Sequence, residues 1–268
     1  MNASPQRLMA VLAHPDDESL GIGGSLAGYA ARGVEIYLVT ATRGERGRFF
    51  TNENRPTDDE VGRVREGELR AAARELGIRE VSLLDYRDGS LDEADPSEAV
   101  RRIVAHLRRV RPQVVVTFDP FGAYGHADHV AISQLTTAAV HAAADATFET
   151  DAAPHQVPKF YYFVTTARRW TAYQAAFKQL TSRVDGEERA ATAWPAWAVS
   201  AEVDTREHWM TAWRAVRRHE SQIAVYAGLD NLTQEQHEAL WGTGTFYRVF
   251  SRVNGGRTRE TDLFEGIG

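Results

Sequence analysis

The chain has 268 residues, 43% hydrophobic and 25% charged, which is typical of a globular protein with one large or two small domains. It has no cysteine, so disulfides are excluded and any metal ion must be held by nitrogen and oxygen ligands. The net charge of −6 argues against general nucleic-acid binding. Neither a membrane span of roughly 20 apolar residues nor a secretory signal is visible in the sequence, so we expect a cytoplasmic protein.

Short apolar runs and helical patterns alternate along the first 165 residues. They predict strands at 8–13, 34–40, 80–84, 113–118 and 159–164, and helices at about 19–32, 57–76 and 96–110 and from 129 to about 144. Strands that alternate with helices indicate βαβ units, hence a mainly parallel sheet with helices on both faces. We therefore expect an α/β fold, a Rossmann-like three-layer sandwich with its active site at the carboxyl ends of the strands.

The pattern is looser beyond residue 165. It predicts helices at 168–180 and 205–223, strands at 199–203 and 245–250, and an acidic turn at 185–188. No internal repeat or low-complexity tract is present. We expect a single catalytic domain over 1–268, in which 1–165 form the α/β core and 166–268 complete and cover the substrate cleft.

An imidazole and two carboxylates follow the first predicted strand, in the stretch Ala13-His14-Pro15-Asp16-Asp17-Glu18. Ligands bind at the carboxyl ends of strands in open parallel sheets, which favours a functional role for this stretch. Acidic residues also begin many helices, because negative charge is favoured at a helix N-terminus. The stretch therefore becomes informative only together with a second cluster.

The second cluster follows the fourth predicted strand and contains His126, Asp128 and His129. His126 and His129 are three residues apart and share one face if they are helical. Imidazole and carboxylate groups suit zinc, and a catalytic zinc keeps three protein ligands and one open position for water. These residues alone predict a mononuclear zinc hydrolase and leave open which of them are ligands.

The two clusters, His14-Pro-Asp16-Asp17 and Tyr124-Gly-His126-Ala-Asp128-His129, resemble the two signatures of the LmbE-like (PIG-L-like) zinc-dependent N-deacetylases. That superfamily includes deacetylases of GlcNAc-phosphatidylinositol and of mycothiol and bacillithiol precursors, and the mycothiol-conjugate amidases. The resemblance extends to about residue 223, through stretches at 65–69, 86–88 and 219–222. One departure is Ala127, where many members have proline.

The resemblance implies a zinc site formed by His14, Asp17 and His129, which other divalent ions could also occupy. It makes Asp16 the general base and His126 the group that stabilises the oxyanion or protonates the leaving amine. Zinc lowers the pKa of its bound water to about 7 and polarises the amide carbonyl, which explains why this residue set suits amide hydrolysis.

Four further residues receive roles from the same resemblance. Asp128 is expected to orient His126, and Tyr124 to donate a hydrogen bond to the tetrahedral intermediate. Arg65 and Asp88 are expected to contact the substrate, although an arginine on a charge-rich helix is by default solvated.

The implied activity is deacetylation of an N-acetylglucosamine-type sugar or glycoside, and the alternative is an amidase acting on a larger thiol-sugar conjugate. The only partner that we expect is this small N-acetylated sugar, without nucleic acid or a membrane span. The sequence leaves open the aglycone, the physiological metal, a homo-oligomeric state, and the roles of His219 and of the loop from Arg43 to Arg48.

Two other classes of protein fit the sequence less well. The stretch Gly21-Ile22-Gly23-Gly24 suggests a dinucleotide-binding domain, but its glycines lie inside a predicted helix and their spacing is not Gly-x-Gly-x-x-Gly. Glycines there favour close packing of the helix on the sheet. A non-catalytic sugar-binding protein is disfavoured because the base, the ligands and the donor are all present.

Overall fold

The computed structural model describes residues 5–50, 53–177, 181–184, 186–222, 224 and 227–268. A seven-stranded sheet with the order β3-β2-β1-β4-β5-β9-β8 forms its centre. The strands are β1 (Arg7–Leu12), β2 (Glu35–Thr42), β3 (Glu80–Tyr86), β4 (Val114–Phe118), β5 (Lys159–Phe163), β8 (Ala201–Asp204) and β9 (Thr243–Ser251). β1 to β5 pair in parallel, and β9 pairs antiparallel with both β5 and β8.

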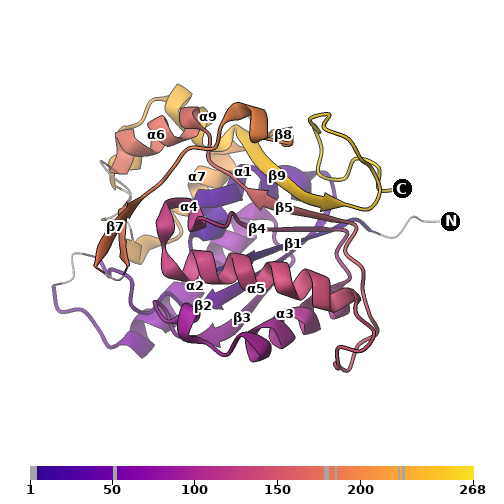
Figure 1. The fold of residues 1–268 in the computed structure, drawn as a ribbon. Helices are drawn as coiled ribbons and strands as arrows, with labels where there is room; N and C mark the ends of the chain where they lie inside the picture. The colour runs from indigo at the N-terminus through magenta and orange to yellow at the C-terminus, as the bar shows by residue number, and fades with distance from the viewer. Residues whose placement is uncertain (1–4, 51–52, 178–180, 185, 223, 225–226) are drawn as a thin grey trace.

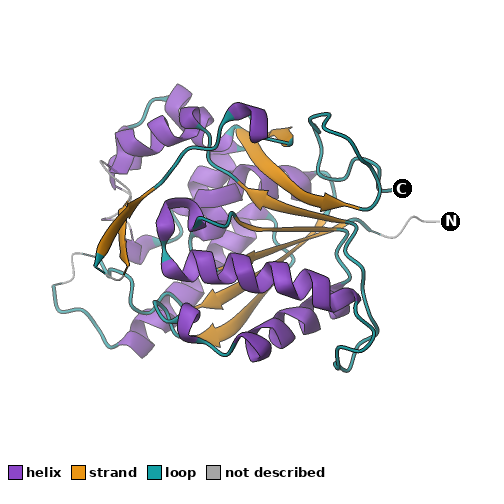
Figure 2. Ribbon diagram, in the orientation of Figure 1, coloured by secondary structure: helices purple, strands orange, loops and turns teal. Residues whose placement is uncertain are grey.

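Helices cover both faces of this sheet (Figures 1 and 2). The helices are α1 (Asp17–Ala31), α2 (Asp58–Leu76), α3 (Pro96–Val110), α4 (Gly122–Gly125), α5 (Ala127–Ala144), α6 (Ala167–Phe177), α7 (Trp209–Val216) and α9 (Gln234–Trp241). Helices α3 and α5 pack together on one face, and α1, α2 and α7 on the other. The expected three-layer α/β architecture is confirmed.

Local sequence signals explain where the helices of the core begin and end. Thr57 and Glu60 form a capping box at the start of α2, and Gly77 ends that helix with a φ of 73°. Asp95 caps the N-terminus of α3, where Pro96 occupies the first turn. Every residue of β4 is buried, as expected for a central strand covered by helices on both faces.

The C-terminal part differs from expectation in several elements. The predicted helix at 205–223 is shorter, because Thr205 donates a hydrogen bond to the Trp241 carbonyl (2.6 Å) and the helix begins at Trp209. A 3-10 turn, η3 (Glu220–Gln222), follows it. The predicted helix at 168–180 corresponds to α6, and its last three residues lie outside the described residues.

Four elements were not predicted from the sequence: the hairpin β6 (Thr181–Val184) and β7 (Glu187–Ala190), the helix α9 and the short helix α4. The hairpin covers most of the expected acidic turn, whose Asp185 is not among the described residues. All residues of β7 are exposed, so the strand has no alternation of apolar and polar residues to reveal it. Three further 3-10 turns are η1 (Leu91–Glu93), η2 (Ala196–Ala198) and η4 (Ala227–Asn231).

The glycines of α1 allow close contact with the C-terminal helices. A Cβ atom at Gly24 would lie 2.0 Å from the Trp241 carbonyl oxygen, and one at Gly23 would lie 3.0 Å from the Cβ of Ala212. The expected tight packing of α1 is present, but at these two positions it is made against α7 and the end of α9 rather than the sheet. Among the described helices, none is both long and apolar enough to cross a membrane.

Candidate active site

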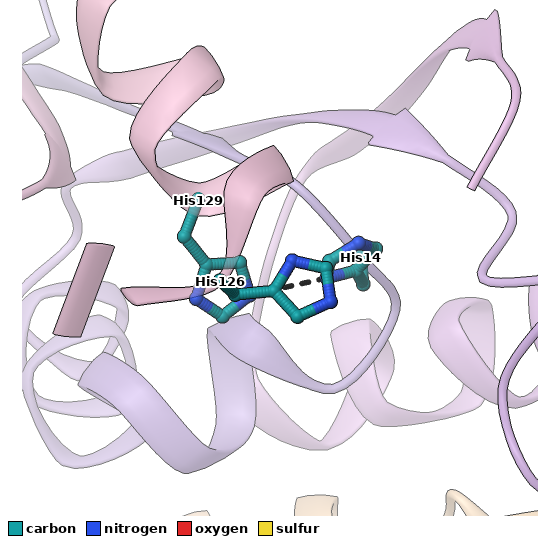
Figure 3. A group of neighbouring side chains, drawn as sticks. All are labelled: His14, His126 and His129. Carbon is teal, nitrogen blue, oxygen red and sulfur yellow. Dashed lines mark hydrogen bonds between the residues drawn. The ribbon is translucent and has the colours of Figure 1, made fainter. Parts of the chain in front are cut away.

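The two motifs meet because β1 and β4 are parallel neighbours in the sheet, so the loops after them lie at the same edge. His14 and Asp16 come from the turn between β1 and α1, and Asp17 is the first residue of α1. His126 is the N-cap residue of α5 and His129 lies in its first turn, and both side chains lie beside His14 (Figure 3).

Two imidazole nitrogens and a carboxylate converge at one point. His14 Nδ1 lies 3.1 Å from His129 Nε2, and the Asp17 carboxylate lies 3.4 Å from His129 Nε2 and 3.7 Å from His14 Nδ1. A tetrahedral ion with bonds of about 2.0–2.1 Å separates its ligand atoms by about 3.3–3.4 Å. The expected ligand set therefore has the spacing that a small divalent cation requires.

In each of the two histidines, the ring nitrogen that faces away from the other histidine (the outer nitrogen) lies near an oxygen atom. This contact leaves the nitrogen that faces the other histidine (the inner nitrogen) with a lone pair for a metal ion. His14 Nε2 lies 2.9 Å from the Asp128 carboxylate, and His129 Nδ1 lies 3.3 Å from the Gly122 carbonyl. Both nitrogens can therefore donate a hydrogen bond to these oxygens. The two inner nitrogens would then face each other with lone pairs, an arrangement that a cation between them relieves. The chemistry of the donor set therefore fits a metal ion.

The charges of Asp17 and His129 favour the same interpretation. Burial raises the pKa of Asp17 to about 7, so a cation beside this carboxylate would restore its ionised form. Burial and the neighbouring imidazoles hold the pKa of His129 well below its ordinary value, which keeps its ring neutral. Burial alone would lower the pKa of His14, but hydrogen bonds with Asp128 and Asp88 raise it.

His126 lies next to His14 and His129, and together with them it forms a second set of possible metal ligands. Its ring centroid is 4.8 Å from those of both His14 and His129, and the three rings also form a group of ligand atoms compatible with a metal ion. A third compatible group joins His14 to Asp88 and Asp128. Burial lowers the pKa of His126, so this imidazole is also neutral at neutral pH.

The carboxylate of Asp128 has a different partner from the expected one. It is fully buried and hydrogen-bonds with His14 Nε2, and it also accepts hydrogen bonds from the backbone N–H groups of Gly89 (2.7 Å) and Leu91 (3.0 Å). Its link to His126 runs instead through the backbone, where the Asp128 N–H donates to His126 Nδ1 (3.2 Å). In this structure, Asp128 therefore orients His14 rather than His126.

Asp16 is held in an unusual backbone conformation. Its φ of 105° lies in the left-handed region, which non-glycine residues rarely adopt. The Asp16 N–H donates to Glu18 Oε2 (3.0 Å), and Arg65 Nη2 donates to the Asp16 carboxylate (2.9 Å) and to the Pro15 carbonyl (2.5 Å). Arg65, which is only 4% exposed, is therefore a buried partner of Asp16 and not a solvated surface residue.

A second buried pair supports this turn, and sequence reasoning missed it. His219 Nε2 lies 2.8 Å from Glu18 Oε1, and Ser19 Oγ donates to the same oxygen. The Glu18 carboxylate thus connects His219 to the backbone of Asp16. The sequence leaves the role of His219 open, and in the structure its side chain is fully buried.

Asp88 and Tyr124 also lie in the pocket around this cluster. Asp88 accepts a hydrogen bond from the Arg46 N–H (2.9 Å) and lies 3.2 Å from His14 Nε2. Burial opposes ionisation of Asp88, but its contacts with His14 outweigh this effect and hold its pKa below the usual range. The ring of Tyr124 stands edge-on to that of His129, with 5.4 Å between the centroids.

The loop that carries Tyr124 is fixed by a residue that the sequence did not single out. The Asp119 carboxylate accepts hydrogen bonds from the N–H groups of Phe121 (2.9 Å) and Ala123 (3.2 Å) and from the indole of Trp194 (2.8 Å). Ala123 has a φ of 61°, a strained value for a residue with a side chain. Asp119 thus ties this strained turn to the C-terminal part of the chain.

All the expected site residues except Asp128 line one pocket, and Asp128 lies behind His14. The pocket is lined by His14, Asp16, Asp17, Leu20, Gly21, Gly47, Arg65, Asp88, Phe118, Ala123, Tyr124, His126, His129, Phe163, Thr165, Arg169, Trp170, Tyr173 and Gln222. From the loop Arg43–Arg48, Gly47 belongs to this lining and the three arginines do not. Arg43 pairs with Glu66 and Asp85.

Comparison with known proteins gives concordant matches. Residues 9–140 match the family described as PIG-L, GlcNAc-PI de-N-acetylase. A 1D-myo-inositol 2-acetamido-2-deoxy-alpha-D-glucopyranoside deacetylase from Nocardioides sp. is 33% identical over 98% of this chain and 99% of its own length.

Two solved structures share the fold. A conserved protein from Thermus thermophilus has a TM-score of 0.67 and 25% identity, covering 92% of this chain and 96% of the other. The N,N'-diacetylchitobiose deacetylase from Pyrococcus horikoshii has a TM-score of 0.69 and 20% identity, covering 91% and 84%.

Proposed function

Because the chain belongs to the GlcNAc-PI de-N-acetylase (PIG-L) family, we propose that it removes the acetyl group from an N-acetylglucosamine glycoside by metal-assisted hydrolysis. The protein is a hydrolytic N-deacetylase, since deacetylases of this type align with almost its full length. The observation that carries the proposal is the convergence of His14, Asp17 and His129 in the pocket that also contains Asp16.

The metal ion in this proposal is zinc, held by His14 Nδ1, His129 Nε2 and the Asp17 carboxylate. The 3.1–3.7 Å spacing of these atoms supports the assignment. A zinc ion bound there would acidify a water molecule and polarise the amide carbonyl. We also propose that the protein is cytoplasmic, as expected from its sequence.

Asp16 is the general base in the proposed reaction. Its carboxylate lines the pocket beside the metal ligands, and Arg65 holds one of its oxygens at 2.9 Å. Asp16 takes a proton from the attacking water, and the left-handed backbone at this residue fixes the direction of its side chain. The hydrogen bond from its N–H to Glu18 maintains that backbone conformation.

His126 and Tyr124 act on the opposite side of the reacting amide. The neutral imidazole at 126 can donate a hydrogen bond to the developing oxyanion, and the Tyr124 hydroxyl adds a second donor. Once this imidazole has taken up a second proton, it can pass that proton to the leaving amine. The depressed pKa of His126 favours release of its proton to the amine. Asp128 orients His14, and Arg65 and Asp88 face the sugar from the pocket wall.

The test uses the purified chain loaded with zinc and measures acetate release from methyl N-acetylglucosaminide and from a myo-inositol N-acetylglucosaminide. We expect one metal ion per chain, activity that is lost on chelation, and activity that returns with added zinc. Asp16→Asn is the matched inactive control. Absence of acetate release from both glycosides would overturn the proposed function, and full activity in verified metal-free protein would overturn the metal site alone.

A further inference from the structure

One wall of the active-site pocket carries a buried cation that the reaction described above does not use. Arg169, from α6, lines the pocket and is 5% exposed. Within the described part of the chain, its guanidinium forms no ion pair with any carboxylate. A buried charge without a counter-ion is unfavourable, so this arginine needs an explanation.

Support of the backbone explains only part of the arginine. Arg169 Nη2 donates to the carbonyls of Leu20 (2.8 Å) and Gly21, next to the point where Ile22 departs from helical geometry in α1. The same Nη2 also lies 3.4 Å from the hydroxyl of Tyr173. Nε is buried without a hydrogen-bond partner in the described residues, and no hydrogen bond from Nη1 to them is present either. An arginine has five N–H donors, and this one uses a single nitrogen.

A second buried arginine in this protein shows what a purely structural role looks like. Arg108 is 3% exposed and also lacks an ion pair within the described residues. It donates from Nε and from both Nη atoms to six oxygen atoms, mostly the carbonyls of 142–152. Its charge is thus spread over a complete set of acceptors, whereas that of Arg169 is not.

The pocket's other buried arginine is neutralised. Arg65 pairs with Asp16 and contacts the Pro15 carbonyl before the first turn of α1, whereas Arg169 contacts carbonyls further along the same helix. Of the proposed metal ligands, Asp17 lies between these two contact points along the chain, so the two arginines contact the turn and helix on either side of it. The side with free cationic donors is that of Arg169.

We propose that Arg169 forms the aglycone subsite of this deacetylase and binds an oxyanion, a carboxylate or a phosphate, on the group attached to the N-acetylglucosamine unit. The inference rests on the proposed function, which places the sugar amide at the metal ligands. A carboxylate or phosphate matches the forked donors of a guanidinium and supplies the missing counter-charge.

Two aromatic residues complete the subsite. The Arg169 guanidinium lies 5.6 Å from the ring centroid of Tyr173, and the Trp170 ring lies 6.1 Å from the same ring. All three residues come from α6 and line the pocket. The guanidinium is buried beside the Tyr173 ring, and its low exposure strengthens its interaction with an anion.

The test compares kcat/KM for three glycosides of N-acetylglucosamine with the zinc-loaded full chain. N-acetylglucosamine 1-phosphate and the carboxymethyl glycoside carry the two kinds of oxyanion, and the methyl glycoside is the neutral reference. We expect the wild type to prefer an anionic glycoside, and the preferred one identifies phosphate or carboxylate. Arg169→Gln should reduce this preference by about 10- to 100-fold, mainly through KM.

Two variants on the same helix sharpen the result. Arg169→Lys keeps the charge without the fork and should retain an intermediate preference, which provides a readout if Arg169→Gln does not fold. Arg168→Gln changes an exposed arginine that does not line the pocket, and it should retain the wild-type preference. A wild type that does not favour either anion, or an equal loss for all three glycosides in Arg169→Gln, would overturn the subsite.

A binding measurement separates this inference from the proposed function. Calorimetric titration of N-acetylglucosamine 1-phosphate and of the carboxymethyl glycoside does not require turnover. If no glycoside releases acetate but one anion binds the wild type at least 10-fold more tightly than Arg169→Gln, the reaction is wrong and the subsite holds. Equal affinities of the two proteins for both anions would contradict the subsite even in an active enzyme. A larger loss of affinity in Arg169→Gln for a myo-inositol glycoside than for either anionic glycoside would show that Arg169 binds hydroxyl groups. That result would overturn the proposal of an anion-binding subsite.

Discussion

His219 Nε2 and Glu18 Oε1 lie 2.8 Å apart, and neither side chain has any exposed surface. The other oxygen of Glu18 accepts the N–H of Asp16, the proposed general base. A residue 201 positions further along the chain therefore supports the catalytic turn through the carboxylate of Glu18. Such an indirect contact predicts an effect on turnover that is separate from metal binding.

We expect His219→Ala to lower kcat by about 10- to 100-fold, the range usual for residues that orient a catalytic or metal-binding group. The variant should bind zinc in the wild-type ratio, because none of the three proposed ligands contacts His219. His141→Ala, which changes an exposed histidine of α5, is the control. Metal analysis with steady-state kinetics would contradict this role if His219→Ala lost zinc, or if both variants kept the wild-type kcat.

Asp16→Asn tests the base directly. Asparagine has nearly the same size as aspartate but cannot accept the proton, so kcat should fall by roughly 10²–10⁴ while zinc remains bound. Arg65 can still donate to the amide oxygen of the new side chain, which preserves the turn. Turnover near the wild-type rate in Asp16→Asn, with zinc present, would rule out this mechanism.

Replacement of His129 should reduce zinc binding, whereas replacement of His126 should reduce only the reaction rate. His129→Ala removes an imidazole whose Nε2 lies 3.1 Å from His14 Nδ1, so zinc affinity and activity should fall together. His126→Ala should retain zinc and lose about 10²–10³ in rate, as expected for one donor to the oxyanion. Equilibrium dialysis with zinc measures the first quantity. An empty site in His126→Ala and an occupied one in His129→Ala would reverse the two roles.

Glu260 provides a pH-dependent contribution to stability far from the reaction. Its carboxylate accepts hydrogen bonds from Lys159 (2.6 Å), Tyr161 (2.6 Å) and Asn254 (2.6 Å). Burial opposes ionisation, but these contacts hold the pKa of Glu260 below its ordinary value. The contribution is therefore complete above the unfolded-state pKa of about 4.3 and is lost as the pH falls through the folded-state pKa.

Urea unfolding of Glu260→Gln checks this expectation. At pH 7 the substitution should lower the free energy of unfolding by about 3 kcal/mol, because Lys159 remains buried without its counter-ion. The difference from wild type should shrink at pH values below about 4. Glu149→Gln, in an exposed loop position, is the control. A difference that grows on acidification would have the wrong sign for a carboxylate with a lowered pKa.

The meeting of the two clusters could be predicted from sequence, because each motif follows a strand of a parallel sheet. The choice of ligands among their residues came from the family resemblance and stays a proposal. The partner of Asp128 could not be predicted, since the choice between His14 and His126 depends on how α5 begins beside the β1 turn. The Glu18–His219 pair spans 201 positions, and a glutamate is usually solvated. The burial of Arg169 depends likewise on the docking of α6 against α1.

The dependence of Asp16 on His219 also has a temporal side. As the chain is synthesised from its N-terminus, both motifs emerge long before the partner of Glu18. A nascent chain that stops before residue 219 already contains every proposed metal ligand, yet its Glu18 carboxylate has no imidazole to meet. The catalytic turn is thus completed by a segment that leaves the ribosome after both motifs, and a gene product shortened to those motifs would be an incomplete enzyme.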